Sequence, residues 1–218
     1  MPKARCVAKG YTKIEGLDYQ EAFAPVVNEV TSRIVFGIGL KRQYSTKVYD
    51  VDAAFLNGDL EEEIYLELPK GFNEPEGTIV RLNKSMYGLV QAARMWMKAK
   101  AQVMKKFGFK RIKTDPCLYT KELKDGELIY VLVYVDECIV IGPPKESDVL
   151  MENVLKIKKL GELQRYNGND YTINMKTGQL QMNQKKLIES MVKEVTIKST
   201  KIPAFPNKNR RKQEKEQP

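Results

Sequence analysis

Histidine is absent from this sequence of 218 residues. Its absence excludes Ser-His and Cys-His nucleophile systems, catalysis by a histidine general base, and every metal site that needs an imidazole ligand. Any catalysis by this chain must therefore use carboxylates, lysine, tyrosine or a bound metal.

Cysteine and long apolar runs are also scarce. The three cysteines, Cys6, Cys117 and Cys138, are odd in number and far apart, so neither a disulfide framework nor a zinc site is indicated. There is no segment of signal-peptide form and no run of about 18 apolar residues. We therefore expect an intracellular protein, cytoplasmic or nuclear, that is neither secreted nor bound to a membrane.

Basic residues, by contrast, are in excess. Lysine and arginine number 37 against 28 aspartate and glutamate residues, which gives a formal net charge of +9. This balance suits a polyanionic partner such as nucleic acid, although many basic proteins bind none. Because 42% of the residues are apolar, the chain can bury a sizeable core as one domain or two closely packed subdomains.

Apolar periodicity and turn residues predict a mixture of helices and strands. The run 129–135 is apolar at every position, which indicates a central strand covered on both faces. In the first helix, Val30, Ile34 and Ile38 form the apolar face. The expected helices are residues 28–44, 91–107, 145–159 and 184–195, and the expected strands are 5–10, 47–54, 63–68, 78–82, 117–122, 128–135 and 138–141.

Two acidic sites interrupt apolar strands. Asp50 and Asp52 lie in the first, and Asp136 and Glu137 are adjacent in the second. Carboxylates at a tight turn between buried strands cost desolvation and repel each other, and a divalent cation relieves both effects. Without histidine, Mg²⁺ held by oxygen ligands is the natural candidate. The alternative is that Asp136 and Glu137 form a solvated β-turn with no metal.

Eight segments, read in order and spacing, resemble the copia-type retrotransposon reverse transcriptases. The resemblance covers residues 3 to 206. The segments are KARCVAKGY (3–11), GLDY (16–19), FAPV (23–26), DVDAAFLNGDL (50–60), LNKSMYGL (82–89), DPCLY (115–119), YVD (134–136) and LGEL (160–163).

The resemblance implies an α+β right-hand polymerase, in which an antiparallel palm sheet packs on helices. Residues 1–198 would be the palm with partial fingers, and 199–218 a polar, basic, disordered tail. The catalytic carboxylates would be Asp50, Asp136 and Glu137, which with the backbone of Val51 would hold two Mg²⁺ ions, or Mn²⁺ in their place. The implied partners are an RNA or DNA template with its primer, and a deoxynucleoside triphosphate.

The resemblance also implies contacts with substrates. Phe55 occupies the place of an aromatic that excludes the ribose 2′-hydroxyl. The alternative interpretation is that Phe55 only packs in the core. Arg5 and Lys9 would meet the triphosphate or template; their alternative is a solvated edge strand. The remaining nucleotide contacts are Asp52, Ala53, Tyr87, Gly88 and Gln91, and the primer contacts are Tyr166, Asn167 and Gly168.

The sequence departs from the family pattern at several positions. Glu137 replaces the usual Asp, Val90 and Ala93 replace Lys and Pro, and Asn167 lies in a segment that is normally apolar. The first fingers residues and the thumb are missing, so the chain is expected to be cut short, and a second polymerase subunit could supply the thumb.

These departures leave alternatives to an active polymerase. One is a non-catalytic nucleic-acid-binding or inert remnant of the palm. Another is an unrelated basic α/β module, which the ordered motifs disfavour. The tail 208–215 is either a nuclear-localisation or nucleic-acid patch or a solvated end.

Overall fold

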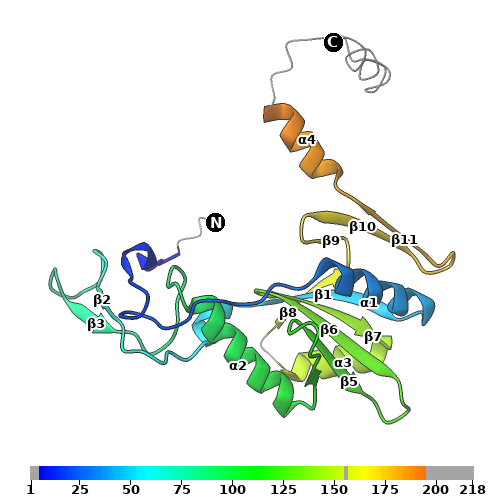
Figure 1. Cartoon of the computed structure of the whole chain (residues 1–218), viewed down its shortest axis with the longest axis horizontal. Helices are drawn as coiled ribbons and strands as arrows, with labels where there is room; N and C mark the ends of the chain where they lie inside the picture. Colours follow the sequence, from blue (N-terminus) through cyan, green and yellow to red (C-terminus); the bar gives the residue numbers. More distant parts are fainter. Residues whose placement is uncertain (1–4, 155–156, 195–218) are drawn as a thin grey trace, which may run out of the picture.

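The computed structural model describes residues 5–154 and 157–194, and shows an α+β protein built from antiparallel sheets and helices (Figure 1). The predicted class is therefore confirmed. Within these residues no helix combines the length and the apolar character needed to cross a lipid bilayer. The expected polar tail, residues 199–218, lies outside the described residues.

A six-stranded antiparallel sheet forms the centre of the molecule, with the strand order β4-β5-β6-β7-β1-β8. The strands β6 and β7 are interior, and Ile129, Val131 and Leu132 of β6 have no exposed surface. This confirms the central, doubly covered strand. The bounds are β1 Ser45–Val51, β4 Lys110–Arg111, β5 Leu118–Glu122, β6 Leu128–Tyr134, β7 Glu137–Gly142 and β8 Ile157–Glu162.

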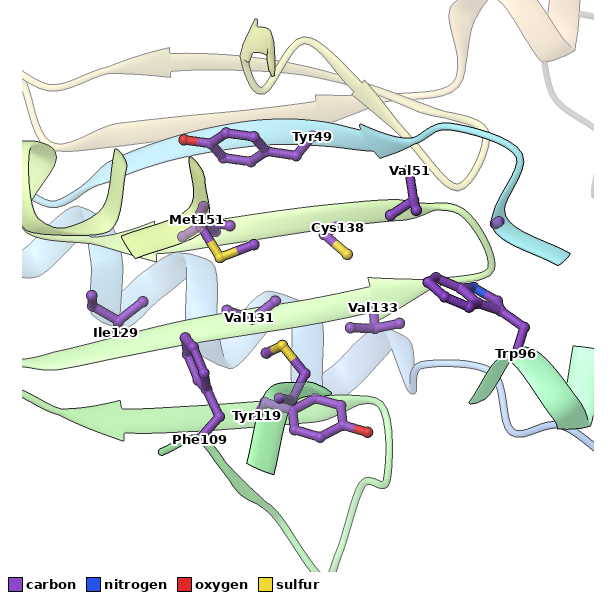
Figure 2. Packing of buried hydrophobic residues seen from close by; sticks show 13 residues of the cluster. Tyr49, Val51, Trp96, Phe109, Tyr119, Ile129, Val131, Val133, Cys138 and Met151 are labelled. Carbon is purple, nitrogen blue, oxygen red and sulfur yellow. The ribbon is translucent and has the colours of Figure 1, made fainter. Parts of the chain in front are cut away.

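One face of this sheet packs on the helices α2 (Ala92–Lys106) and α3 (Pro144–Val154). Alternate residues of β1, β6 and β7 point into this layer, where they meet Trp96 and Met104 of α2 and Met151 of α3. Figure 2 shows Trp96 at the end of β6, beside the turn into β7. This end of the sheet is therefore anchored to α2.

The opposite face packs on α1 (Glu29–Lys41) and on a three-stranded sheet of order β11-β10-β9. Phe36 of α1 makes edge-to-face contacts with Tyr171 and Tyr166, at centroid distances of 5.4 and 6.5 Å. The short strands are β9 Arg165–Tyr166, β10 Asn169–Asn174 and β11 Gln179–Asn183, and the exposed helix α4 (Lys185–Glu194) follows them.

A smaller unit lies beyond the end of α2 that begins at Ala92 (Figure 1). It contains the two-stranded sheet of β2 (Tyr65–Glu67) and β3 (Ile79–Arg81), the N-terminal segment with the 3-10 helix η1 (Gly10–Thr12), and a core of its own. That core is centred on Ala8, Ile64 and Leu89. A second 3-10 helix, η2 (Ala54–Asn57), links this unit to β1.

The predicted apolar face of the first helix was wrong. Val30 and Ile34 are 62% and 58% exposed, whereas Val35 and Phe36 are buried. The helix is turned so that the large Phe36 ring meets Tyr171, and Gly39 lies against the sheet. A Cβ atom on Gly39 would lie 2.5 Å from Cγ2 of Ile141, so glycine permits this close approach.

Two other elements also differ from expectation. Residues 5–10 form no strand, because they have a single backbone bond to a neighbouring segment, from the Ala8 amide to the Tyr87 carbonyl (2.8 Å). The third helix ends at Val154, and residues 157–162 form the edge strand β8 instead of continuing it. Pairing with β1 supplies backbone partners that the local sequence does not reveal.

Candidate active site

Asp50 and Glu137 are paired across neighbouring strands at one end of the central sheet. The register of β1 and β7 places Asp50 opposite Glu137, and the next amide, that of Val51, donates to the carbonyl of Asp136 (2.9 Å). Because side chains alternate along a strand, both carboxylates share the sheet face of Val48 and Ile139. Two acidic segments far apart in the sequence thus meet at one place.

The turn that carries Asp136 has an unusual backbone. Val135 adopts a left-handed conformation with φ +50°, which is rare for a β-branched residue and costs on the order of 1–3 kcal/mol. Its carbonyl accepts two hydrogen bonds from α2, one from Nε1 of Trp96 (2.6 Å) and one from Nζ of Lys100 (2.9 Å). Two hydrogen bonds from α2 therefore stabilise the strained turn.

The carboxylates at this turn influence each other. Burial raises the pKa of Glu137, and the negative charges of Asp136 and Asp50 raise it further. Burial lowers the pKa of the Lys100 ammonium, while Cys138, Cys117 and Asp136 act in the opposite direction. Negative charge is thus concentrated at the end of the sheet, with one buried cation beneath it.

The donor set has the chemistry that a hard divalent cation needs, since Asp50 and Glu137 lie opposite each other on paired strands and Asp136 precedes Glu137 in the turn. In the described ranges, however, no three Cys, Asp or Glu side chains converge closely enough to form a ready-made metal site. The backbone brings the three carboxylates together, and their side chains would have to turn to share one ion.

A second group of predicted residues lies where η2 meets the N-terminal segment. The half-buried ring of Phe55 makes an edge-to-face contact with Tyr87, with centroids 4.8 Å apart. The guanidinium carbon of Arg5 lies 4.6 Å from the centroid of the same Tyr87 ring. The structure therefore brings Arg5, Tyr87 and Phe55 into one cluster, with Tyr87 in contact with both others.

The other residues expected at the nucleotide occupy varied positions. Asp52 and Ala53 are exposed in the turn after β1, and Ala53 has φ +50°. Lys9 and Gly88 are also exposed. Gln91 instead is 1% exposed, and its amide donates to Glu62 (3.4 Å), so it does not face solvent in this structure.

The predicted primer segment forms the turn between β9 and β10. Tyr166 is buried, and its ring lies 5.9 Å from that of Tyr134, which pairs directly with Glu137 across β6 and β7. Asn167 and Gly168 are exposed, with left-handed φ values of +45° and +77°. This turn is thus connected to the carboxylates through Tyr134.

Three residues near the carboxylates were missed by the sequence prediction. Lys100 and Trp96 hold the Val135 carbonyl, and the β1–β8 register places Lys158 beside Asp50. A signal existed for Lys100, which interrupts the apolar stripe Ala92, Trp96, Met104 at a spacing of four residues. No signal existed for Lys158, because its strand was predicted as helix.

The family model described as "Reverse transcriptase (RNA-dependent DNA polymerase)" matches residues 1–208. The chain belongs to this family. It is 33% identical over 210 residues to the retrovirus-related Pol polyprotein from transposon TNT 1-94 of Nicotiana tabacum, covering 94% of this chain and 16% of the polyprotein. It is 37% identical over 155 residues to the corresponding polyprotein from transposon RE2 of Arabidopsis thaliana, covering 70% of this chain and 10% of the polyprotein.

The expected kinship with copia-type reverse transcriptases is therefore confirmed. The chain spans about a sixth or less of the length of these two polyproteins. No solved structure matches it.

Proposed function

We propose that this chain is the palm and partial fingers of a reverse transcriptase, which transfers a nucleotide from a deoxynucleoside triphosphate to a primer 3′-hydroxyl on an RNA or DNA template. The observation that carries the proposal is the pairing of Asp50 with Glu137, next to Asp136, in a chain of the reverse transcriptase family. This reaction uses bound metal ions, and carboxylates gathered at the end of a sheet can hold them.

In this proposal Asp50, Asp136 and Glu137, with the backbone of Val51, would hold two Mg²⁺ ions, and Mn²⁺ could replace them. Such ions, when bound, activate a hydroxyl nucleophile and stabilise charge on the leaving pyrophosphate. The raised pKa of Glu137 is consistent with the assignment, because its causes, burial first and then the negative charges of Asp136 and Asp50, would both be offset by a bound cation. Glu137 has one methylene more than Asp, so a weakened metal shell is expected.

The cluster of Arg5, Tyr87 and Phe55 would select and hold the incoming nucleotide. Tyr87 fixes the Phe55 ring from one side, so that Phe55 could exclude a ribose 2′-hydroxyl by its bulk. The cation–π contact holds Arg5 at the same place, where its guanidinium could bind triphosphate oxygens. The exposed Lys9 and the backbone at Asp52 and Ala53 complete the proposed binding region.

The exposed turn at Asn167 and Gly168 would contact the primer backbone. It is joined through Tyr166 and Tyr134 to the strand pair that carries Glu137, so a primer bound there would lie near the carboxylates. Asn167 lies in a segment that is apolar in the family pattern, so its packing on the primer backbone is expected to be weaker.

A non-catalytic remnant that binds nucleic acid is the competing function. The observation that favours it is that, among the described residues, no three side chains form a ready-made metal site. The presence of Glu137 also favours the remnant, since its side chain is longer than that of Asp and alters the metal shell. The two functions share a fold and differ only in turnover.

Primer extension on an oligonucleotide template separates the two functions. We expect Mg²⁺-dependent extension by the parent chain and a loss on the order of 10²–10³-fold in Asp50→Asn, because several kcal/mol of transition-state stabilisation disappear with the ligand. A gel-shift titration at two salt concentrations measures template binding independently. Salt-dependent binding without extension in either protein would establish the remnant.

Glu137→Asp serves as the matched variant at the same turn. Because the shorter carboxylate suits an octahedral Mg²⁺ shell, we expect this variant to extend primers about tenfold faster than the parent when Mg²⁺ is limiting. Equal rates at all Mg²⁺ concentrations would show that Glu137 is not a metal ligand.

A further inference from the structure

Lys100 is a fully buried lysine in the middle of α2. Its exposed fraction is 0%, and its ammonium lies 4.8 Å from the centroid of the Trp96 ring. Burying a lysine is costly unless its head group is bound, so such a position requires an explanation from its contacts. Its hydrogen bond goes to the carbonyl of Val135, in the turn between β6 and β7 that also carries Asp136.

The peptide that receives this hydrogen bond leads directly into Asp136. Fixing the Val135 carbonyl fixes the plane of the Val135–Asp136 peptide, because the peptide unit is rigid. The next carbonyl, that of Asp136 itself, accepts from the Val51 amide (2.9 Å). Both peptides that flank the Asp136 Cα atom are therefore tied, one to α2 and the other to β1.

The conformation held in this way is one that the chain would not adopt alone. Val135 is left-handed, and a β-branched residue in that region tends to return to extended or helical backbone. Two donors on one carbonyl, Lys100 and Trp96, oppose that return. Both donors are buried to 1% exposure or less, so neither can exchange this acceptor for a water molecule without leaving the core.

We propose that Lys100, assisted by Trp96, is a positioning residue that holds the turn between β6 and β7 in its strained form and so sets the direction of the Asp136 and Glu137 carboxylates. The role of those carboxylates rests on the proposed function above, whereas the restraint on the turn does not. Lys100 touches no substrate in this assignment and acts through the backbone of Val135.

The variant Lys100→Met keeps the length and the apolar stem of the side chain but removes the donor. It should fold, because methionine avoids the desolvation cost of the buried ammonium and Nε1 of Trp96 still donates to the Val135 carbonyl. Trp96→Phe removes the second donor. Lys105→Met, at an exposed position of the same helix, is the matched control.

Hydrogen exchange of the turn tests the restraint without any substrate. We expect the Asp136 and Glu137 amides to exchange about tenfold faster in Lys100→Met than in the parent, since one hydrogen bond contributes roughly that factor to an opening equilibrium. The effects of Lys100→Met and Trp96→Phe should be non-additive in the double variant, because the two donors share one acceptor. Lys105→Met should exchange like the parent.

Metal binding and steady-state kinetics test the consequence for the carboxylates. Mn²⁺ titration followed by electron paramagnetic resonance should show about tenfold weaker binding in Lys100→Met. Primer extension should show a lower kcat at unchanged KM for template-primer, a split that a general loss of stability does not produce.

The outcomes separate this inference from the function on which it draws. If Lys100→Met loosens the turn but the parent neither binds Mn²⁺ nor extends primers, the restraint stands and the proposed polymerase function fails. Unchanged exchange of the turn in Lys100→Met would overturn the inference, as would unchanged Mn²⁺ affinity in an active parent. Failure of Lys100→Met to fold would also overturn it, because a residue that only positions the turn can be replaced by methionine.

Discussion

Replacing Gly88 with alanine should push the N-terminal segment away from the loop that carries Tyr87. A Cβ atom at Gly88 would lie 2.1 Å from the carbonyl oxygen of Ala8 and 2.8 Å from its nitrogen. These are backbone atoms and cannot rotate away. The Ala8 amide also donates to the Tyr87 carbonyl, so the overlap falls on the backbone bond that joins residues 5–10 to this loop.

The expected loss combines two effects. Gly88 has φ +90°, and a side chain in left-handed backbone costs about 1–2 kcal/mol. The overlap requires the Ala8 backbone to retreat by more than an ångström, and forced displacement of this kind costs about 1–3 kcal/mol. The unfolding free energy of this unit should therefore fall by roughly 2–5 kcal/mol.

Gly126 provides a matched control. Its φ of +82° is close to that of Gly88, but no atom lies within 4 Å of the Cβ position. Gly126→Ala therefore has the conformational cost of about 1–2 kcal/mol without the overlap. The difference between the two variants isolates the steric contribution.

Urea unfolding and amide exchange measure the effect at two scales. We expect Gly88→Ala to lower the unfolding free energy more than Gly126→Ala, and to speed exchange of the Ala8 amide at least tenfold. Arg5 should also lose its restraint on Tyr87, so nucleotide binding should weaken if the proposed site is correct. Equal losses in the two variants, with Ala8 exchange unchanged, would refute the reasoning.

Two further predictions concern α3 and nucleotide selection. Burial raises the pKa of Asp148, but hydrogen bonds from Lys159, Lys47 and Tyr49 outweigh this effect and hold the pKa well below its ordinary value. The ionised carboxylate therefore stabilises the folded state fully above the unfolded-state pKa of about 3.9. This stabilisation is lost as the pH falls through the folded-state pKa. Asp148→Asn should thus lower the unfolding free energy by about 1–3 kcal/mol at pH 7. In urea titrations below about pH 4 the difference in unfolding free energy between variant and parent should shrink, and a difference independent of pH would contradict this account. Phe55→Ala should reduce discrimination against ribonucleotides at least tenfold in single-nucleotide incorporation, because the ring that fills the space next to Tyr87 is gone, whereas an unchanged ratio would assign Phe55 to core packing alone.

Much of the central sheet could be predicted from local sequence. The continuous apolar run in β6 required burial on both faces, and the positions of β5 and β7 followed from short apolar segments between turn residues. The strand β8 could not be predicted, because an edge strand has no distinctive local pattern and depends on its partner β1. The buried face of α1 could not be predicted either, because it depends on the aromatic rings, Tyr166 and Tyr171, against which the helix packs.

The acidic residues of the candidate site were identifiable from the sequence, because charges inside apolar strands have no structural use there. The residues that lie next to these carboxylates in the fold could not be predicted from the sequence. That Asp50 faces Glu137 follows from strand register, and that Lys158 lies beside Asp50 follows from an edge strand whose partner is distant in the chain. Register depends on contacts between whole strands, which no local pattern specifies.

The sequence by itself determined the family, the α+β class and the identity of the carboxylates, because these depend on ordered motifs and on local polarity. Only the tertiary structure decided how the acidic turn is held. The absence of histidine restricted the possible catalytic groups of this chain to carboxylates, lysine, tyrosine or a bound metal. Packing then buried Lys100 at a position of α2 where the four-residue spacing favours an apolar residue. A buried donor is recognised by the acceptor it meets, and that acceptor, the Val135 carbonyl, comes from a segment outside its own helix.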